Sequence, residues 1–200
     1  MSVAALARVY LIRHGETEWS LDGRHTGRSD IPLTHHGRDE SRGLGIRFRG
    51  LTFERILSSP RLRARQTCEA IGWGGEFDID PDLSEWDYGD YEGVRSAEIR
   101  NTRPAWSLFR DGCPNGETPE RIAERADRVL AGLRALHGNV AICSHGDFGR
   151  VLGARWIGLT VAQAQRLLLA TASLSVLGYE HDLSDRPAII LWNEVAYDHR

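Results

Sequence analysis

The chain has 200 residues, of which 41% are hydrophobic and 26% are charged, and its formal net charge is -3. This composition is typical of a globular protein with a core of its own, and we expect one domain over residues 1–200. The slightly acidic balance does not support a nucleic-acid partner, and no apolar run has the length of a signal peptide or a membrane span.

Short apolar runs alternate with amphipathic stretches, which is the pattern of βαβ units around a mostly parallel sheet. In chain order the first expected elements are a strand at 9–12, a helix at 37–49, a strand at 53–58, a helix at 61–71 and a weaker strand at 77–79. The fold class is therefore α/β, and we expect a three-layer α/β/α sandwich.

The segment 81–119 is rich in Trp, Tyr, Gly and Asp, with only brief helical pattern near 94–103 and 105–110. We interpret it as an insertion lying over an edge of the sheet, where active-site loops are often found.

The clearest helix begins at Thr118-Pro119, an N-cap hydroxyl followed by proline in the first turn, and Gly138 marks its end. The remaining expected elements are a strand at 140–143, helices at 148–157 and 161–169, and strands at 173–179 and 188–192.

Cysteines and the more scattered histidines point away from metal sites. The three cysteines, Cys68, Cys113 and Cys143, are odd in number and lack a close CxxC pair, which argues against a disulfide framework and a structural zinc site. We expect a cytoplasmic protein. The spacing of the remaining histidines matches no common metal-ligand pattern, so we expect solvated or capping roles for His25, His35, His36 and His137.

Two histidines follow predicted strands directly. Arg13-His14-Gly15 comes after the first strand, and Ser144-His145-Gly146 comes after the strand at 140–143. The carboxyl ends of parallel strands form the ligand crevice of such sheets, so we expect His14 and His145 to meet there. Gly146 permits close backbone approach to a ligand, and the following helix could bind an anion with its first N–H groups.

Taken together, the motifs resemble those of the histidine phosphatase superfamily, with its phosphoglycerate-mutase-like fold, over most of the chain. The motifs in family order are Leu11–Ser20, Gly23–Gly27 with Asp30–Thr34, Ser59–Thr67, Leu83–Gly89 with Glu92-Gly93, and Gly116-Glu117 with Ser144–Gly146. The resemblance implies Arg63 as the second phosphate-binding arginine and Glu85 as the proton donor. It also implies substrate contacts at Ser20, where the family more often has Asn, and at Thr26, Gly27, Tyr88 and Gly146.

These residue types fit phosphoryl transfer through a covalent phosphohistidine. A neutral imidazole at His14 can attack phosphorus, while Arg13, Arg63 and His145 can stabilise the charge on the equatorial oxygens. A poor alkoxide leaving group needs a general acid, which would be Glu85 with a raised pKa. This chemistry requires no metal and no other cofactor.

We therefore expect a phosphatase that acts on a small phosphorylated metabolite such as a sugar phosphate or bisphosphate. Within the family the chain looks most like acid phosphatases and sedoheptulose-bisphosphatase-like members, because Trp86, Ser96 and Trp106-Ser107-Leu108 replace the basic residues of the mutases. A phosphoglycerate mutase using the same phosphoenzyme is the alternative, and a non-catalytic phospholigand-binding module is a more remote one. A homodimer is the one protein assembly that we consider.

Overall fold

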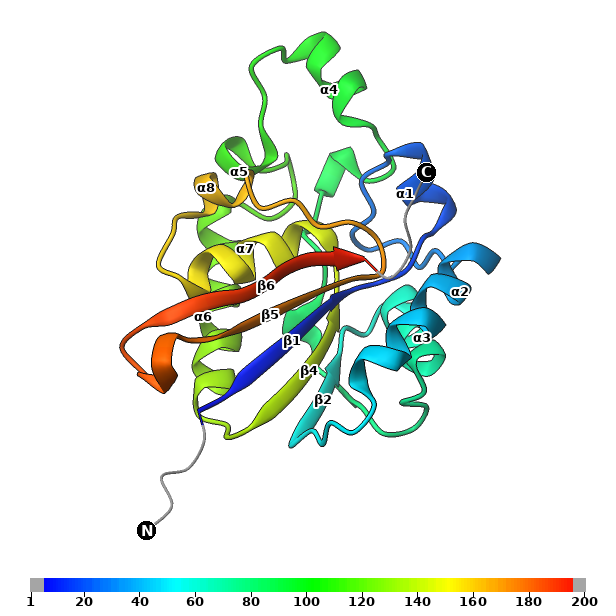
Figure 1. Ribbon diagram of the computed structural model, residues 1–200. Coiled ribbons are helices and arrows are strands. Elements are labelled where there is room, and N and C mark those ends of the chain that lie inside the picture. The colour runs from blue at the N-terminus through cyan, green and yellow to red at the C-terminus, as the bar shows by residue number, and fades with distance from the viewer. Residues whose placement is uncertain (1–5, 196–200) are drawn as a thin grey trace.

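The computed structural model describes residues 6–195 and contains a six-stranded mixed sheet. Its strands are β1 (Arg8–Arg13), β2 (Arg55–Ser58), β3 (Asp78–Ile79), β4 (Asn139–Ser144), β5 (Ser173–Tyr179) and β6 (Pro187–Val195). Their order across the sheet is β3-β2-β4-β1-β5-β6 (Figure 1). The four strands β3, β2, β4 and β1 are parallel to one another, whereas β5 runs antiparallel to both of its neighbours, β1 and β6. The predicted α/β class with a mostly parallel sheet is confirmed.

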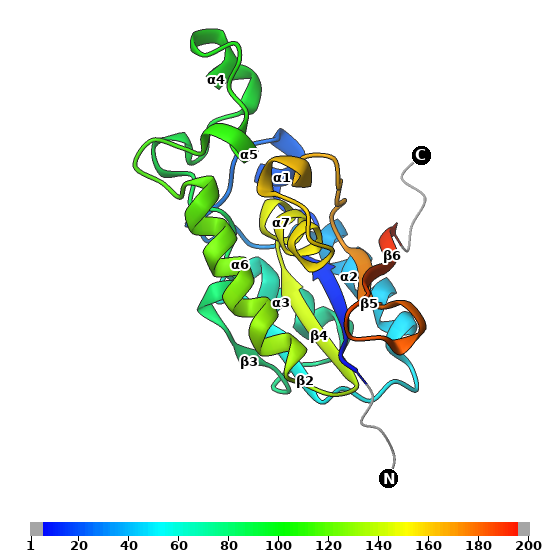
Figure 2. The ribbon, with the colours of Figure 1, turned by 90° about the vertical axis from the view of Figure 1, so that its left-hand side faces the viewer.

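Helices flank both faces of the sheet. They are α1 (Glu18–Asp22), α2 (His35–Leu44), α3 (Leu62–Ile71), α4 (Ser96–Thr102), α5 (Leu108–Asp111), α6 (Pro119–Arg134), α7 (Gly146–Trp156) and α8 (Val161–Ala164). Short 3-10 helices are η1 (Gly45–Phe48), η2 (Pro81–Leu83), η3 (Gly89–Tyr91) and η4 (Glu180–Asp182). Figure 2 views the molecule from the side that carries α6 and α7. None of the helices within residues 6–195 has both the length and the apolar character needed to cross a bilayer.

Alternating side chains along the central strands face two separate apolar layers, as a period of two requires. Leu11 and Ile142 belong to the core that includes α6 and α7, whereas Ile12 and Cys143 belong to the core that includes α2 and α3. Both strands are buried on both faces, so their sequences are continuous apolar runs.

The segment 81–119 contains η2, η3, α4 and α5. It extends from the end of the molecule at which β1 and β4 finish, and α4 lies farthest from the sheet (Figures 1 and 2). Ser144, the last residue of β4, donates from its hydroxyl to the carbonyl oxygen of Leu83 at 2.8 Å, which fixes the start of this segment at the carboxyl end of the sheet.

Several observed elements differ from the predicted ones for identifiable reasons. α1 was not predicted, since it has only five residues and depends on a capping box between Thr17 and Ser20. The helix predicted at 161–169 ends at Ala164, where the carbonyl groups of Ala164 and Gln165 accept hydrogen bonds from the guanidinium of Arg150. The last strand continues to Val195, through an irregularity in its pairing with β5.

Candidate active site

The two strand-end histidines lie side by side. In the parallel pairing of β1 with β4, Arg13 is opposite Ser144, so the residues that follow leave the sheet at the same level. The backbone N–H of His14 donates to the carbonyl of Ser144 at 3.0 Å, and the two imidazole ring centres are 5.3 Å apart. The sheet thus brings together residues separated by most of the chain.

The ring of His14 is held in one tautomer by its own backbone neighbour. Its Nδ1 lies 2.8 Å from the carbonyl oxygen of Gly15, which can only accept a hydrogen bond. Nδ1 must therefore carry the proton, and the lone pair is on Nε2. The sequence did not reveal this partner, because a carbonyl group leaves no residue-type signal.

Burial also keeps His14 uncharged. Its surroundings lower the pKa of the imidazole well below 6.5, first through desolvation and then through the positive charges of Arg63 and Arg13. The Gly15 carbonyl acts in the opposite direction but does not reverse the shift. A neutral ring with a free Nε2 is a nucleophile at neutral pH.

Arg63 lies entirely below the surface, in the first turn of α3. Its Nη1 donates to the carbonyl of Ser29 at 2.9 Å and its Nη2 to that of Thr26 at 2.8 Å, which ties the guanidinium to the loop after α1. Burial lowers the pKa of Arg63 to about 10, so the group remains charged at neutral pH.

Arg13 is held from two sides at the end of β1. Its Nη1 donates to the carbonyl oxygen of Leu169, and its guanidinium lies beside Gly146. A Cβ atom at position 146 would come within 3.2 Å of the guanidinium carbon, so glycine leaves the space that this side chain occupies.

Three buried nitrogens of this cluster have no hydrogen-bond partner among the described residues: Nε of Arg13, Nε of Arg63 and Nδ1 of His145. The other ring nitrogen of His145 lies 2.7 Å from the hydroxyl of Ser59, and when that hydroxyl donates, Nδ1 is the protonated nitrogen. The remaining buried polar atoms of this kind belong to Arg61, Arg65 and Ser173. Buried donors without partners are rare in folded proteins, and three of them beside one nucleophile suit an anion with several oxygens.

The carboxyl group of Glu85 lies at the N-terminus of α7. Its carboxyl oxygens accept from the backbone N–H groups of Trp86 at 2.9 Å, Phe148 at 2.7 Å and Asp147 at 3.1 Å. Desolvation, followed by the negative charge of Asp147, raises the pKa of Glu85 above 4.5, while these N–H groups oppose the shift. The expectation that the N-terminus of α7 receives a ligand anion is wrong for the N–H groups of Asp147 and Phe148, because both donate to the carboxyl of Glu85.

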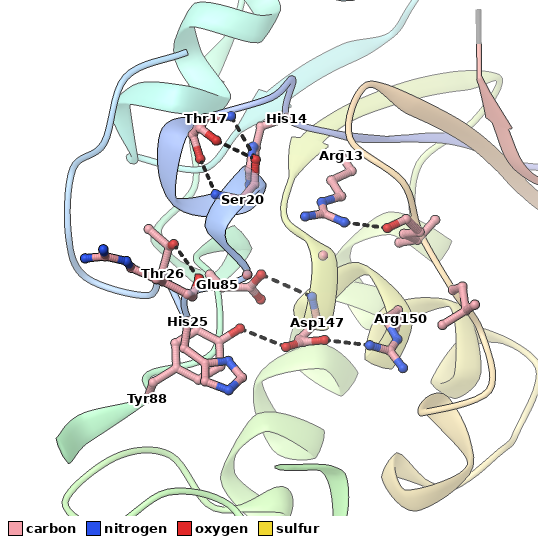
Figure 3. A pocket seen from close by; sticks show the side chains of 15 residues that line it. Arg13, His14, Thr17, Ser20, His25, Thr26, Glu85, Tyr88, Asp147 and Arg150 are labelled. Atoms are coloured by element: carbon pink, nitrogen blue, oxygen red, sulfur yellow. Dashed lines mark hydrogen bonds and ion pairs between the residues drawn. The ribbon is translucent and has the colours of Figure 1, made fainter. Parts of the chain in front are cut away.

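Tyr88, Asp147 and Arg150 form a chain along one wall (Figure 3). The Tyr88 hydroxyl donates to Asp147 at 2.8 Å, and the other oxygen of Asp147 is 2.8 Å from Nη1 of Arg150. Burial and Asp147 raise the pKa of Tyr88 well above 10, so its hydroxyl keeps its proton. The hydroxyl of Tyr88 is therefore committed to Asp147.

These groups surround a cavity of about 210 Å³ (Figure 3). Of the predicted site residues, those that line it are Arg13, His14, Ser20, Thr26, Glu85, Tyr88 and Gly146. Arg63 and His145 are buried beside His14 and are not among the residues that line the cavity. Gly27 is outside the lining, and its N–H donates to the carboxylate of Glu92 at 3.0 Å.

The hydroxyls of Ser20 and Thr26 already have backbone partners. Ser20 donates to the carbonyl of Thr17 at 2.8 Å and completes the cap of α1, and Thr26 donates to the carbonyl of Arg24 at 3.0 Å. Each oxygen can still accept or exchange a hydrogen bond at the cavity wall.

The solvated position predicted for His25 is wrong. It is half-buried in the cavity wall rather than solvated, with its ring centre 4.5 Å from that of Tyr88 and its Nε2 at 3.1 Å from the Ser96 hydroxyl. Desolvation lowers its pKa.

Thr17, Asp147 and Arg150 also line the cavity, although none of them was predicted as a site residue. Of the three, only Asp147 could have been suspected from the sequence, because it directly follows the Ser-His-Gly motif.

A second cavity of about 240 Å³ adjoins the first and shares His25, Asp147 and Arg150 with it. Ser96, Arg100, Trp106 and Gln165 are among its other lining residues. Within residues 6–195 no cluster of three or more His, Cys, Asp or Glu side chains is arranged to hold a metal ion.

Residues 9–195 match the family model of the histidine phosphatase superfamily, branch 1. The chain is 37% identical over 179 residues to an acid phosphatase of Mycobacterium tuberculosis, with 87% of each chain covered. It is 32% identical to sedoheptulose 1,7-bisphosphatase of Saccharomyces cerevisiae, with 92% of each covered, and 34% identical to a probable phosphoglycerate mutase of Proteus mirabilis, with 88% of this chain and 86% of that one covered.

A solved structure from Mycobacterium tuberculosis, the product of an open reading frame, superposes with a TM-score of 0.88. It is 33% identical to this chain, and the match covers 96% of this chain and 99% of that one. The arrangement of strands and helices around the cavity is therefore shared with a known fold over nearly its whole length.

Proposed function

The chain belongs to the histidine phosphatase superfamily, and from this premise we propose that it hydrolyses small phosphate monoesters through a phosphohistidine formed at His14. The observation that carries the proposal is the placement of a neutral imidazole, with its Nε2 lone pair free, beside three buried donors that have no partner in the described chain. Such donors can stabilise charge as it develops on a transferring phosphoryl group.

In the first half-reaction Nε2 of His14 attacks phosphorus and the bond to the ester oxygen breaks. The guanidinium groups of Arg13 and Arg63 and the ring of His145 stabilise the three equatorial oxygens of the transition state. Glu85 gives its proton to the departing oxygen, so the alcohol leaves uncharged and the carboxylate remains. A raised pKa is what this role requires of a carboxylic acid.

In the second half-reaction water attacks the phosphohistidine. The carboxylate of Glu85 takes one proton from this water, the bond from phosphorus to Nε2 breaks, and inorganic phosphate is released. His14 returns to its neutral tautomer, since Nδ1 keeps its proton on the Gly15 carbonyl throughout. Glu85 thereby recovers the proton that it lost in the first step.

Hydrolysis is favoured over return of the phosphoryl group to a sugar acid. Trp86 is fully buried and donates to the Glu117 carbonyl, Ser96 contacts His25, and Trp106 is buried and donates to the Gly112 carbonyl. None of these three positions supplies a positive charge that would retain a substrate carboxylate over the phosphoenzyme. Water can then reach the intermediate before a second sugar acid does.

For the physiological ester we propose a sugar phosphate or a sugar bisphosphate. The second cavity adjoins the reaction cavity through a shared wall, so the alcohol part of the ester can extend into it. Its lining offers hydroxyl, imidazole and amide groups for sugar hydroxyls, and Arg100 for a second anion. Among the relatives, one is named a sedoheptulose bisphosphatase.

For the cellular location we propose the cytoplasm. Cys68, Cys113 and Cys143 are all buried and free of disulfides, as is usual where thiols are kept reduced.

The test is an assay of the pure protein with a chelator present, using p-nitrophenyl phosphate, fructose 1,6-bisphosphate and 3-phosphoglycerate in parallel. The proposal expects free phosphate from the esters and no isomer of phosphoglycerate, with or without 2,3-bisphosphoglycerate as a primer. Isomer formation that outpaces phosphate release would instead assign the chain to the mutases. Binding without any turnover would leave a phospholigand-binding module.

A further inference from the structure

The loop between α8 and β5, residues 165–172, carries the group that holds Arg13. The carbonyl oxygen of Leu169 accepts from Nη1 of Arg13, and Leu168 and Leu169 both line the reaction cavity. The same loop is tied to the nucleophile, because the N–H of Ala172 donates to the carbonyl of His14 at 3.1 Å. The position of this loop therefore sets where the Arg13 guanidinium lies.

Two consecutive side chains of β6 hold this loop on either side of Leu169. The indole Nε1 of Trp192 donates to the carbonyl of Leu168 at 2.8 Å, and the side-chain oxygen of Asn193 accepts from the N–H of Ala170 at 2.6 Å. Each bond fixes a peptide group next to Leu169, and together they leave the Leu169 carbonyl little freedom to turn.

A β-bulge allows neighbouring side chains to reach the same loop. Consecutive residues of a regular strand point to opposite faces. Here β6 pairs Leu191 with Val176 and Glu194 with Leu174, so both Trp192 and Asn193 lie opposite the single residue Ser175. Such an insertion bends the strand and redirects a side chain, and bulges are frequent next to active sites.

The backbone of Asn193 has the left-handed conformation that the bulge requires, with φ of 59°. Asparagine tolerates this region better than most residues with a side chain. Its N–H donates to the hydroxyl of Ser175 at 3.0 Å, which secures the bulge. The indole of Trp192 is seated against α7, where a Cβ atom on Gly153 would come within 2.5 Å of the ring.

We propose that Trp192 and Asn193 are positioning residues for Arg13, acting through the carbonyl group of Leu169. The proposal rests on the proposed function, in which Arg13 stabilises the transferring phosphoryl group. Nε of Arg13 is buried and unpartnered in the described chain, so a guanidinium turned away from Leu169 would no longer present this donor to the phosphoryl oxygens. The C-terminal edge strand thus contributes to catalysis without touching the substrate.

Two substitutions remove the hydrogen bonds with little other change. Trp192→Phe keeps an aromatic ring against Gly153 but lacks the N–H. Asn193→Gly removes the acceptor, and glycine adopts the positive φ of this position without strain. Asn193→Asp, which keeps an acceptor oxygen, is the conservative rescue. The matched control is Asn115→Gly, because Asn115 is exposed and has a φ of 56°.

The experiment measures kcat/KM for p-nitrophenyl phosphate and the inhibition constant of orthovanadate, with thermal melting as a check of folding. The double variant Trp192→Phe/Asn193→Gly should lower kcat/KM about tenfold, since misplacement of a catalytic group by about 1 Å can reduce rates by up to about 10²-fold. Vanadate inhibition should weaken in parallel, and Asn193→Asp and Asn115→Gly should keep nearly full activity.

A double-mutant cycle separates positioning from a general structural role. In an Arg13→Ala background the same double variant should change kcat/KM by less than about twofold, because the residue through which it acts is gone. An equal loss in both backgrounds would overturn the proposal, as would no loss in the wild-type background.

A structural comparison keeps the inference separate from the proposed function. Crystal structures of the wild type and the double variant should show the Arg13 guanidinium released from Leu169 only in the variant, whether or not the wild type releases phosphate. An unmoved guanidinium would refute the positioning role. A wild type without phosphatase activity would refute the proposed function alone.

Discussion

The His14 imidazole combines two requirements that usually conflict. A nucleophile that binds anions needs positive groups beside it, and it also needs an unshared electron pair. Here burial lowers the pKa of the ring, and the positive charges of Arg63 and Arg13, which we propose bind phosphate, lower it further. The Gly15 carbonyl then determines which nitrogen carries the remaining proton.

The acid role proposed for Glu85 predicts a dependence on the leaving group. Glu85→Gln should slow hydrolysis of an alkyl ester such as β-glycerophosphate by about 10²-fold or more, because general acid catalysis commonly contributes about 10²–10⁴-fold. For p-nitrophenyl phosphate, whose leaving group needs little protonation, the first step should be slowed far less. Burst kinetics would distinguish the two half-reactions. Equal effects on the first step of both esters, or no effect on either, would show that another group is the acid.

The pKa shifts predict the form of the pH profile. His14 must be neutral to attack, and its pKa is lowered from 6.5, so activity should persist as the pH falls below 6.5. Glu85 must be protonated to act as an acid, and its pKa is raised from 4.5, so activity toward alkyl esters should fall as the pH rises beyond that raised value. The measurement is kcat/KM for β-glycerophosphate between about pH 4 and pH 9, in the wild type and in Glu85→Gln. A basic limb that survives in Glu85→Gln would contradict the assignment.

At the scale of elements, the start of α2 and the loop after β1 approach each other through two glycines. A Cβ atom on Gly15 would come within 2.3 Å of the Gly37 carbonyl oxygen, and one on Gly37 within 2.2 Å of the Glu16 carbonyl oxygen. The contact presses the backbone that follows His14 against the helix. The N-cap of α2 reinforces it, since the Thr34 hydroxyl donates to Glu16 at 2.7 Å.

Gly37→Ala should therefore be destabilising by about 1–3 kcal/mol, the usual range for overpacking, and should reduce activity by moving His14. The matched control is Gly132→Ala in α6, where a Cβ atom would meet nothing within 4 Å. That substitution should stabilise the protein by about 0.5–1 kcal/mol because alanine favours a helix. Chemical denaturation measures both. A harmless Gly37→Ala would mean that this contact is loose.

Helices and strands with a clear hydrophobic periodicity were predicted well, whereas short elements without such periodicity were not. α6 has a capped start and a long apolar face, on which Ile122, Ala126 and Val129 are all buried. α1 and the end of α8 are accompanied instead by individual hydrogen bonds, which have no periodicity in the sequence. The bulge in β6 likewise depends on its pairing with β5, which the sequence of β6 alone does not specify.

At the scale of the whole molecule, the proposed function assigns the reaction to the first of the two adjoining cavities and the rest of the substrate to the second. His25 stands in their common wall, in contact with Tyr88 on one side and with Trp106, at a ring distance of 5.7 Å, on the other. Arg100 lines the second cavity and not the first, and its Nε donates a long hydrogen bond of 3.4 Å to the Trp106 carbonyl.

This division predicts that Arg100 affects selectivity rather than the chemical step. In Arg100→Gln, the ratio of kcat/KM for fructose 1,6-bisphosphate to that for p-nitrophenyl phosphate should fall about tenfold, the size of one lost charge-assisted hydrogen bond. Arg49→Gln, at an exposed arginine outside both cavities, is the control and should leave the ratio unchanged. An unchanged ratio in Arg100→Gln as well would show that Arg100 takes no part in substrate recognition.

The sequence anticipated the residue types of the site better than their arrangement. His14 and His145 were expected at strand ends and do meet there, since the parallel register alone requires it. The positions of His25 and Gly27 were not foreseeable in this way, because both lie on the loop after α1, whose path depends on tertiary contacts with Glu92 and Ser96. The partner that fixes the His14 tautomer is a main-chain atom and carries no side-chain signature.

The most direct test of the account is to trap the covalent intermediate. Rapid acid-free quenching of the protein mixed with a ³²P-labelled ester, followed by peptide mapping, should find an acid-labile, base-stable phosphoryl group on the peptide that contains His14. The label should be absent from His14→Ala, whose melting should confirm that it is folded. Turnover by the wild type with no label at His14, or label retained in His14→Ala, would contradict a phosphohistidine at this position.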